Sequence, residues 1–202
     1  MSAPWQPAAD TRGLLLVGCA PATVAAWVRR GLVACHVQPL GRWTAVVPAE
    51  PRSRAQPPYD DAVSVLAARP VPHRMRPTIG LFASAGRAVL TVQPRGWRGG
   101  QRWLVWEPGR GVIGAPGLVP ARPADLVRAT GSGRGIGAVL GDPAGDADRL
   151  VVRVMEVLGL PGGDVLRTGG TGPVVTPSPK AVSRFDARAT EDARHRAELE
   201  EG

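Results

Sequence analysis

The sequence is short of several residue types, and each shortage excludes a class of protein. It contains no asparagine, a single lysine (Lys180), one tyrosine (Tyr59) and two cysteines (Cys19 and Cys35). Two cysteines are too few to hold together a secreted disulfide scaffold. The apolar runs fall far short of the about 18 residues that a membrane-spanning helix needs. We therefore expect no membrane partner.

Cys19 ends a short segment that fits the lipidation motif of bacterial lipoproteins. The apolar stretch before it runs only from Leu14 to Val17. A signal peptide needs an apolar region of about 7–15 residues, so this stretch is too short to direct export. We therefore expect a cytoplasmic protein in which both cysteines are unpaired.

The chain is strongly basic, but its charge is unevenly distributed. Arginine supplies 24 of the 25 basic residues, against 17 acidic ones, for a net charge of +8. A GC-rich genome accounts for part of this arginine, since lysine and asparagine codons are AT-rich. It does not explain why residues 1–140 carry +11 and residues 141–202 carry −3. This split predicts a basic body that attracts an anionic partner and an acidic tail that competes with it.

The apolar pattern predicts an α+β fold with a mainly antiparallel sheet and helices packed on one face. Short alternating segments separated by turns indicate the strands, and apolar residues three and four apart indicate the helices. The expected strands are 14–19, 32–39, 43–47, 78–84, 87–94 and 102–107, and the expected helices are 21–31, 59–69, 121–129 and 148–160.

A partial internal repeat suggests two similar βββα halves, residues 11–70 and 78–131. The sequence Val37-Gln38-Pro39 recurs as Val92-Gln93-Pro94, and Arg42-Trp43 recurs as Arg102-Trp103. We expect residues 1–10 to be a flexible leader, 11–160 a globular domain that ends in helix 148–160, and 161–202 a disordered, charged tail.

Residues 87–110 combine arginine with tryptophan and contain Glu107 as their only acid. Both residue types are common at the centres of protein interfaces. Trp97 lies in a glycine-rich loop, where no core position requires it, while Trp103 and Trp106 point to opposite faces of a strand, so at least one is expected in the core. The predicted partner-binding residues are Arg95, Trp97, Arg98, Arg102, Trp106 and Arg110.

The segment from Gly18 to Leu32 resembles the turn and second helix of helix-turn-helix domains of the MerR and excisionase kind. In that family a β-hairpin wing follows, which corresponds here to residues 32–47. The resemblance implies that Thr23, Arg29 and Arg30 contact DNA, and we add Arg42 at the turn of the wing as a candidate for binding nucleic acid. The residues alone leave another interpretation open, in which 14–19 is a strand followed by an amphipathic helix.

No set of residues with catalytic spacing is present. Residues 130–137 resemble the glycine-rich phosphate loop of short-chain dehydrogenases, but the Tyr-x-x-x-Lys pair of that family is absent because Tyr59 is the only tyrosine. His36, His73 and His195 lie far apart, without metal-ligand spacing. We therefore expect that the protein is not an enzyme and that it binds no cofactor and no metal.

The function predicted from the sequence is that of a non-enzymatic binding or adaptor module. It would engage an acidic protein partner, or a second copy of itself, through the basic Arg/Trp hairpin. The alternative is a DNA- or RNA-binding regulator that uses segment 18–47 or the same hairpin.

Overall fold

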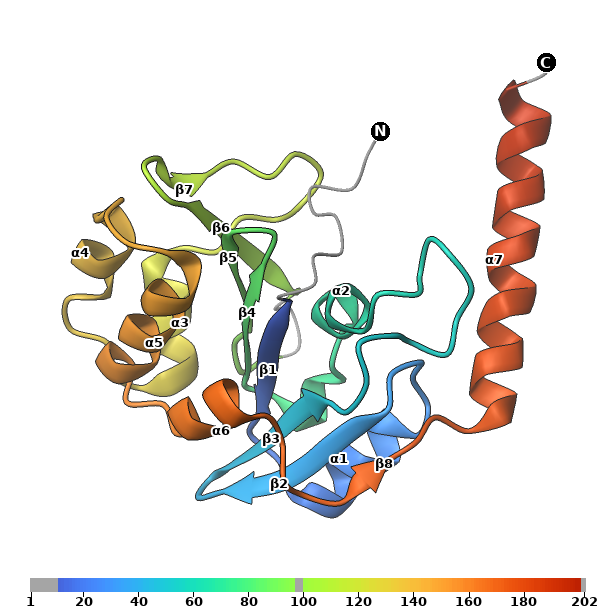
Figure 1. Cartoon of the computed structure of the whole chain (residues 1–202), viewed down its shortest axis with the longest axis horizontal. Coiled ribbons are helices and arrows are strands. Elements are labelled where there is room, and N and C mark those ends of the chain that lie inside the picture. The colour runs from blue at the N-terminus through green and yellow to red at the C-terminus, as the bar shows by residue number, and fades with distance from the viewer. Residues whose placement is uncertain (1–10, 97–99, 201–202) are drawn as a thin grey trace.

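The protein is built around one antiparallel sheet of eight strands (Figure 1). The computed structural model describes residues 11–96 and 100–200. Across the sheet the strand order is β7-β6-β5-β4-β1-β3-β2-β8, and every neighbouring pair is antiparallel. The strands are β1 (Arg12–Val17), β2 (Cys35–Leu40), β3 (Trp43–Pro48), β4 (Thr78–Ser84), β5 (Arg87–Gln93), β6 (Arg102–Glu107), β7 (Gly111–Ile113) and β8 (Val174–Val175).

The apolar run at the start of the described chain forms β1, in the middle of the sheet. Leu14 and Leu16 contact one core and Leu15 and Val17 the other, because successive side chains of a strand point to opposite faces. All four side chains are buried. A strand covered on both faces needs apolar residues at every position, and this requirement explains the unbroken Leu-Leu-Leu-Val run.

Helices cover both faces of the sheet, so the prediction that they pack on one face is wrong. Helices α3 to α6 pack on the face of Leu14, and α1 and α2 pack on the face of Leu15 (Figure 1). The central strands β1 and β4 are buried along nearly their whole length and therefore need cover on both sides. The helices are α1 (Pro21–Val28), α2 (Ala62–Ala68), α3 (Pro123–Thr130), α4 (Ile136–Gly141), α5 (Ala147–Val157), α6 (Gly163–Thr168) and α7 (Pro179–Glu200), with a short 3-10 turn at His73–Met75.

The α+β class and the antiparallel sheet are confirmed, as are several predicted helix positions. Asp61 begins α2 by accepting a hydrogen bond from the backbone N–H of Ser64 at 2.6 Å. Asp146 begins α5 in the same way, with the N–H of Arg149 at 2.8 Å. These carboxylates satisfy backbone donors that a helix start leaves without partners.

The two predicted halves meet edge to edge at β1 and β4, but their matched segments are not equivalent. If the two halves were related by a two-fold axis between β1 and β4, that axis would superpose β3 on β5 and β2 on β6. Because the axis would run perpendicular to the sheet, equivalent helices would lie on the same face of the sheet. The sequence match pairs β2 with β5 and β3 with β6 instead. Helices α2 and α3 also pack into opposite cores. In the described fold, the segments that match in sequence therefore do not occupy symmetric positions in the sheet.

The tail begins later in the chain than predicted. Residues 163–175 form α6 and β8, with Leu166 and Val175 buried, and β8 pairs with β2 at the sheet edge. Helix α7 then extends away from the sheet (Figure 1). Near the start of α7, the ring of Phe185 meets that of Tyr59 edge to face, with centroids 5.1 Å apart.

In the part of the chain that the structure describes, none of the helices has both the length and the apolar character required to cross a membrane. The expected leader, residues 1–10, lies outside the described residues.

Candidate functional site

The arginines of segment 87–110 do not form one face. Because β5 and β6 are antiparallel, Arg87 and Arg110 lie at one end of the pair and Arg95 and Arg102 at the other. At the first end, both arginines form ion pairs with Glu107, and the Arg110 Nη1 atom lies 2.8 Å from the Glu107 carboxylate. The charge at that end is therefore partly neutralised within the protein.

Trp106 is a core residue, so its assignment to the partner-binding set is wrong. Its side chain is fully buried and packs with Leu104 against the helices on one face, while Trp103 packs into the opposite core. This confirms that the two tryptophans point to opposite faces and that at least one is buried. Trp97 and Arg98 lie outside the described residues.

The helix-turn-helix interpretation is wrong because the segment before α1 is a strand. In such a domain a first helix positions the second, but here Arg12–Val17 pairs on both sides within the sheet. Thr23 is half-buried on α1, whereas Arg29 and Arg30 are exposed just after its end. The backbone N–H of Ser178 donates a hydrogen bond of 2.8 Å to the carbonyl of Arg29.

Three arginines from separate segments line one cavity where β1 and β5 end and β3 and β4 begin. Arg42 comes from the β2–β3 turn, Arg95 follows β5, and Arg128 lies on α3. The cavity has a volume of about 240 Å³. We call it the arginine cavity. The residues that line it are Gly18, Arg42, Trp43, Pro77, Arg95, Arg128, Ala129, Thr130 and Gly131, and none of these described residues is acidic.

Arg42 is fixed in place by two contacts. Its Nη2 group donates a hydrogen bond to the carbonyl oxygen of Thr130, at the end of α3. Its guanidinium also lies over the ring of Trp43, 5.3 Å from the ring centroid. A cation over an indole face is attracted by the negative face of the ring. One positive charge of the arginine cavity is thus held in position before any ligand binds.

The acid Asp125 contacts two arginine side chains at this end of the sheet, those of Arg102 and Arg128. Its side chain is 7% exposed, and it accepts hydrogen bonds from the backbone N–H of Arg122 at 2.9 Å and from Arg102 Nη1 at 3.4 Å. Arg128 Nη1 is 4.0 Å away. In the described structure, Arg95 has no hydrogen-bond or ion-pair partner. One carboxylate therefore pairs with two arginines, and an excess of positive charge remains at the cavity.

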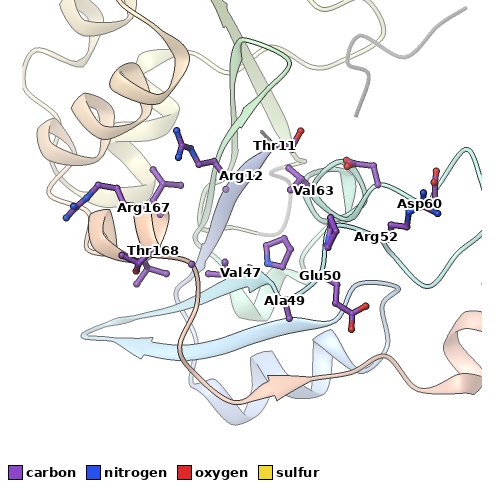
Figure 2. Close-up of a pocket in the computed structure, with 17 residues that line it drawn as sticks. Thr11, Arg12, Val47, Ala49, Glu50, Arg52, Asp60, Val63, Arg167 and Thr168 are labelled. Carbon is purple, nitrogen blue, oxygen red and sulfur yellow. The ribbon is translucent and has the colours of Figure 1, made fainter. Parts of the chain in front are cut away.

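A larger cavity of about 710 Å³ lies at the opposite end of the sheet (Figure 2). Figure 2 shows Arg12 and Arg167 on one side of it and Glu50, Arg52 and Asp60 on the other. We call it the mixed-charge cavity. Its charged lining residues are Arg12, Glu50, Arg52, Asp60, Asp61 and Arg167.

Most charges of the mixed-charge cavity have protein partners. Arg12 pairs with Asp148 of α5, and Arg167 pairs with Asp164 of α6. The carboxylate of Asp61 is used to begin α2. The residues around this cavity therefore balance each other and leave little net charge for a ligand.

Two of the groups that could perform chemistry, Cys35 and Thr130, are withdrawn from solvent or already bonded. Burial raises the pKa of the Cys35 thiol to about 12, against a smaller opposite effect of Arg69, so the reactive thiolate is scarce at neutral pH. In the arginine cavity, the hydroxyl of Thr130 donates to the Ser132 carbonyl at 2.6 Å. Among the described residues, no three His, Cys, Asp or Glu side chains are grouped so that they could hold a metal ion.

Sequence reasoning named Arg42 and Arg95, but in two different hypotheses, and it missed Arg128 and Trp43 as members of one site. Positions 42, 95 and 128 are too far apart for any local motif to connect them. The signal that was available is the alternation of strands and turns, since turns after β2 and β5 place their residues at the same end of an antiparallel sheet. Finding Arg128 also requires knowing where α3 ends.

Comparisons with protein-family models, with curated protein sequences and with solved structures gave no match to this chain.

Proposed function

We propose that this protein is a non-enzymatic, cytoplasmic binding module that engages an acidic protein partner through the arginine cavity. The observation that carries the proposal is the convergence of Arg42, Arg95 and Arg128 on one concave site whose described lining contains no acid. Cations gathered without counter-charges repel each other, and an anion that binds among them removes this repulsion. The partner is a different protein or a second copy of this chain.

The residues of the cavity support binding rather than catalysis. Arginine stays protonated at every physiological pH and therefore neither accepts nor releases a proton in a reaction cycle. The described lining contains no histidine, cysteine, serine or carboxylate. Its one hydroxyl, on Thr130, already bonds backbone carbonyls. What this set of groups offers an anion is a fixed array of donors.

A nucleic acid is the second candidate, because its phosphates are also anions. Arg42, which we added as a nucleic-acid-binding candidate at the turn of the expected wing, is one of the three arginines of the cavity. Arg29 and Arg30 are exposed as well. Nucleic-acid binding requires a track of cations along the surface and depends steeply on salt concentration.

The test measures binding of hexaglutamate and of duplex DNA to the full chain over a series of salt concentrations. A site variant replaces Arg42, Arg95 and Arg128 with glutamine. A matched control replaces Arg52, Arg134 and Arg149 with glutamine, so that both variants lose three positive charges. These three arginines are exposed, form no ion pair in the described structure and do not line the arginine cavity.

We expect hexaglutamate to bind the wild type and the control, and to bind the site variant at least about tenfold more weakly, as loss of charge-assisted hydrogen bonds implies. Equal losses in both variants would show that net charge alone attracts the ligand and would contradict the proposal. Tighter binding of DNA than of hexaglutamate, with a steep salt dependence, would favour the second candidate.

A further inference from the structure

We propose that the arginine cavity takes a phosphate monoester, presented as a phosphorylated side chain of the protein partner. This inference rests on the proposed function and names the chemical group that binds. It concerns the described lining alone, in which Arg42, Arg95 and Arg128 are the charged residues.

The charge of the cavity matches a phosphate monoester better than a carboxylate. A phosphorylated serine carries about −1.5 to −2 charges at pH 7 and three acceptor oxygens, whereas a glutamate carries one charge on two oxygens. The three arginines that line the cavity come from three segments, a hairpin turn, a strand end and a helix. A tetrahedral group with three free oxygens can accept a hydrogen bond from each, and a planar carboxylate cannot do so as well.

The cavity is partly organised before the anion arrives. Arg42 is held by the Thr130 carbonyl and by the ring of Trp43. Its remaining N–H groups are still able to donate, because a guanidinium has five of them. Arg95, by contrast, has no bonded partner in the described structure, so engaging a ligand costs it no existing interaction. Arg42 is already held in position and Arg95 has no bond to break, so little has to be rearranged when an anion binds.

One residue that lines the cavity also has a buried donor without a partner in the described structure. Trp43 lines the cavity, its side chain is 3% exposed, and its indole Nε1 makes no hydrogen bond within the described residues. Leaving a buried N–H unpaired is costly, so such a donor calls for an explanation. An oxyanion in the adjacent cavity would provide the missing acceptor.

The shape of the site favours a monoester over a nucleic-acid backbone. A polynucleotide carries evenly spaced phosphodiesters, each with one negative charge, and binds along extended basic grooves. Here the arginines meet at a single cavity of about 240 Å³, and those at the other end of β5 and β6 pair with Glu107. This arrangement suits one compact, doubly charged group.

The experiment uses calorimetric titration of the full chain with four probes. Three are Ala/Gly heptapeptides that differ only at the central residue, which is phosphoserine, glutamate or serine, and the fourth is a single-stranded thymidine hexamer. We expect the phosphoserine peptide to bind at least about tenfold more tightly than the glutamate peptide, because the dianion adds a charge and an acceptor. The serine peptide should not bind measurably.

The site variant and the matched control described above locate the effect. The site variant should remove the preference for phosphoserine, and the control should keep it. As the second pKa of the phosphate is about 6, binding should strengthen from pH 5 to pH 7 while the arginines stay charged. The glutamate peptide, already ionised over most of that range, should change much less.

The outcomes separate this inference from the proposed function. If the phosphoserine and glutamate peptides bind equally while hexaglutamate still requires the arginine cavity, the phosphate inference is wrong and the acidic-partner proposal stands. If no peptide binds and hexaglutamate does not bind either, both are wrong. Tighter binding of the thymidine hexamer than of the phosphoserine peptide overturns the inference in favour of nucleic acid.

Discussion

The two ends of the sheet differ in whether their arginines are paired with carboxylates. At the mixed-charge cavity, Arg12 and Arg167 each have a carboxylate partner, and acids line the same space. At the arginine cavity, which has about a third of that volume, only Arg128 of the three lining arginines has a carboxylate partner in the described structure, and that partner is Asp125. The charges that line the larger cavity therefore balance, whereas those that line the smaller one are all positive.

This difference shows that volume is a poor guide to the binding site of this protein. A cavity whose charges are already paired gains little from a charged ligand, because the ligand must compete with an existing partner. At the arginine cavity a ligand meets only one such competitor in the described structure, the carboxylate of Asp125 beside Arg128. The net positive charge of the sequence thus points to a particular binding site only when it is known which arginines have a carboxylate partner and which do not.

Charge reversal at the two ends should produce the largest contrast. We expect Arg95→Glu to weaken binding of the phosphoserine peptide about 100-fold, since it removes a charge-assisted hydrogen bond and adds repulsion. Arg110→Glu makes the same change in net charge at the other end and should weaken binding less than about threefold at physiological salt, where distant charges are screened.

Calorimetric titration of both variants decides the point, with thermal unfolding as a control. Because Arg95 has no bonded partner in the described structure, its variant should unfold at nearly the wild-type temperature. Equal loss of affinity in the two variants would remove the distinction between the ends.

Removing the carboxylate of Asp125, which lies beside the arginine cavity, should sharpen the comparison. Asp125→Asn keeps the shape of the side chain but deletes the charge that faces Arg102 and Arg128. We expect a loss of about 2 kcal/mol in stability, because buried donors lose a charged acceptor, which lowers the unfolding temperature by about 5 °C. Affinity for the phosphoserine peptide should rise severalfold, since Arg128 no longer has a competing anion. An unchanged or lower affinity would contradict this account of the charge excess.

The fold could be predicted from the sequence where local pattern and tertiary role agree. Asp61 precedes an apolar stripe and begins α2, and the apolar side of 148–160 becomes the buried side of α5. Prediction failed where distant segments decide the outcome. The segment from Leu14 to Val17 is too short for its apolar periodicity to distinguish a helix from a strand. Pairing with β3 and β4 makes it a strand. Likewise, two valines in a glycine-rich tail gave no sign that Val175 would pair with Cys35.

The candidate site was harder to predict than the fold, for the same reason. Composition identified arginine and tryptophan as residues of interest, but burial separates them, since Trp106 is core and Arg95 is exposed. Ion pairing separates the arginines further, because Arg110 has Glu107 beside it and Arg95 has no such neighbour in the described residues. Neither property can be read from a single sequence.

A smaller effect is expected from the indole donor of the arginine cavity. Trp43→Phe keeps an aromatic ring in the core and beneath Arg42, but removes Nε1–H. We expect affinity for the phosphoserine peptide to fall about threefold to tenfold, which is the effect of losing one hydrogen bond to a charged group after partial replacement by water. Trp106→Phe is the matched control, because it removes the other buried Nε1–H that has no partner in the described residues, in the core away from the cavity lining. If the two variants bind equally, the Trp43 donor does not face the anion.

The smallest effect should come from the mixed-charge cavity. Arg12→Gln breaks the ion pair with Asp148 that links β1 to α5, but both side chains are about half exposed. Exposed ion pairs contribute about 0.2–1 kcal/mol, so the unfolding temperature should fall by no more than about 4 °C. The affinity for the phosphoserine peptide should stay within about twofold of wild type at physiological salt, since the opposite end of the sheet is beyond the screening length. Thermal unfolding and titration of the same sample measure both quantities. A loss of affinity comparable with that of Arg95→Glu would mean that the paired arginines also contact the partner, and the contrast between the two ends would no longer identify the site.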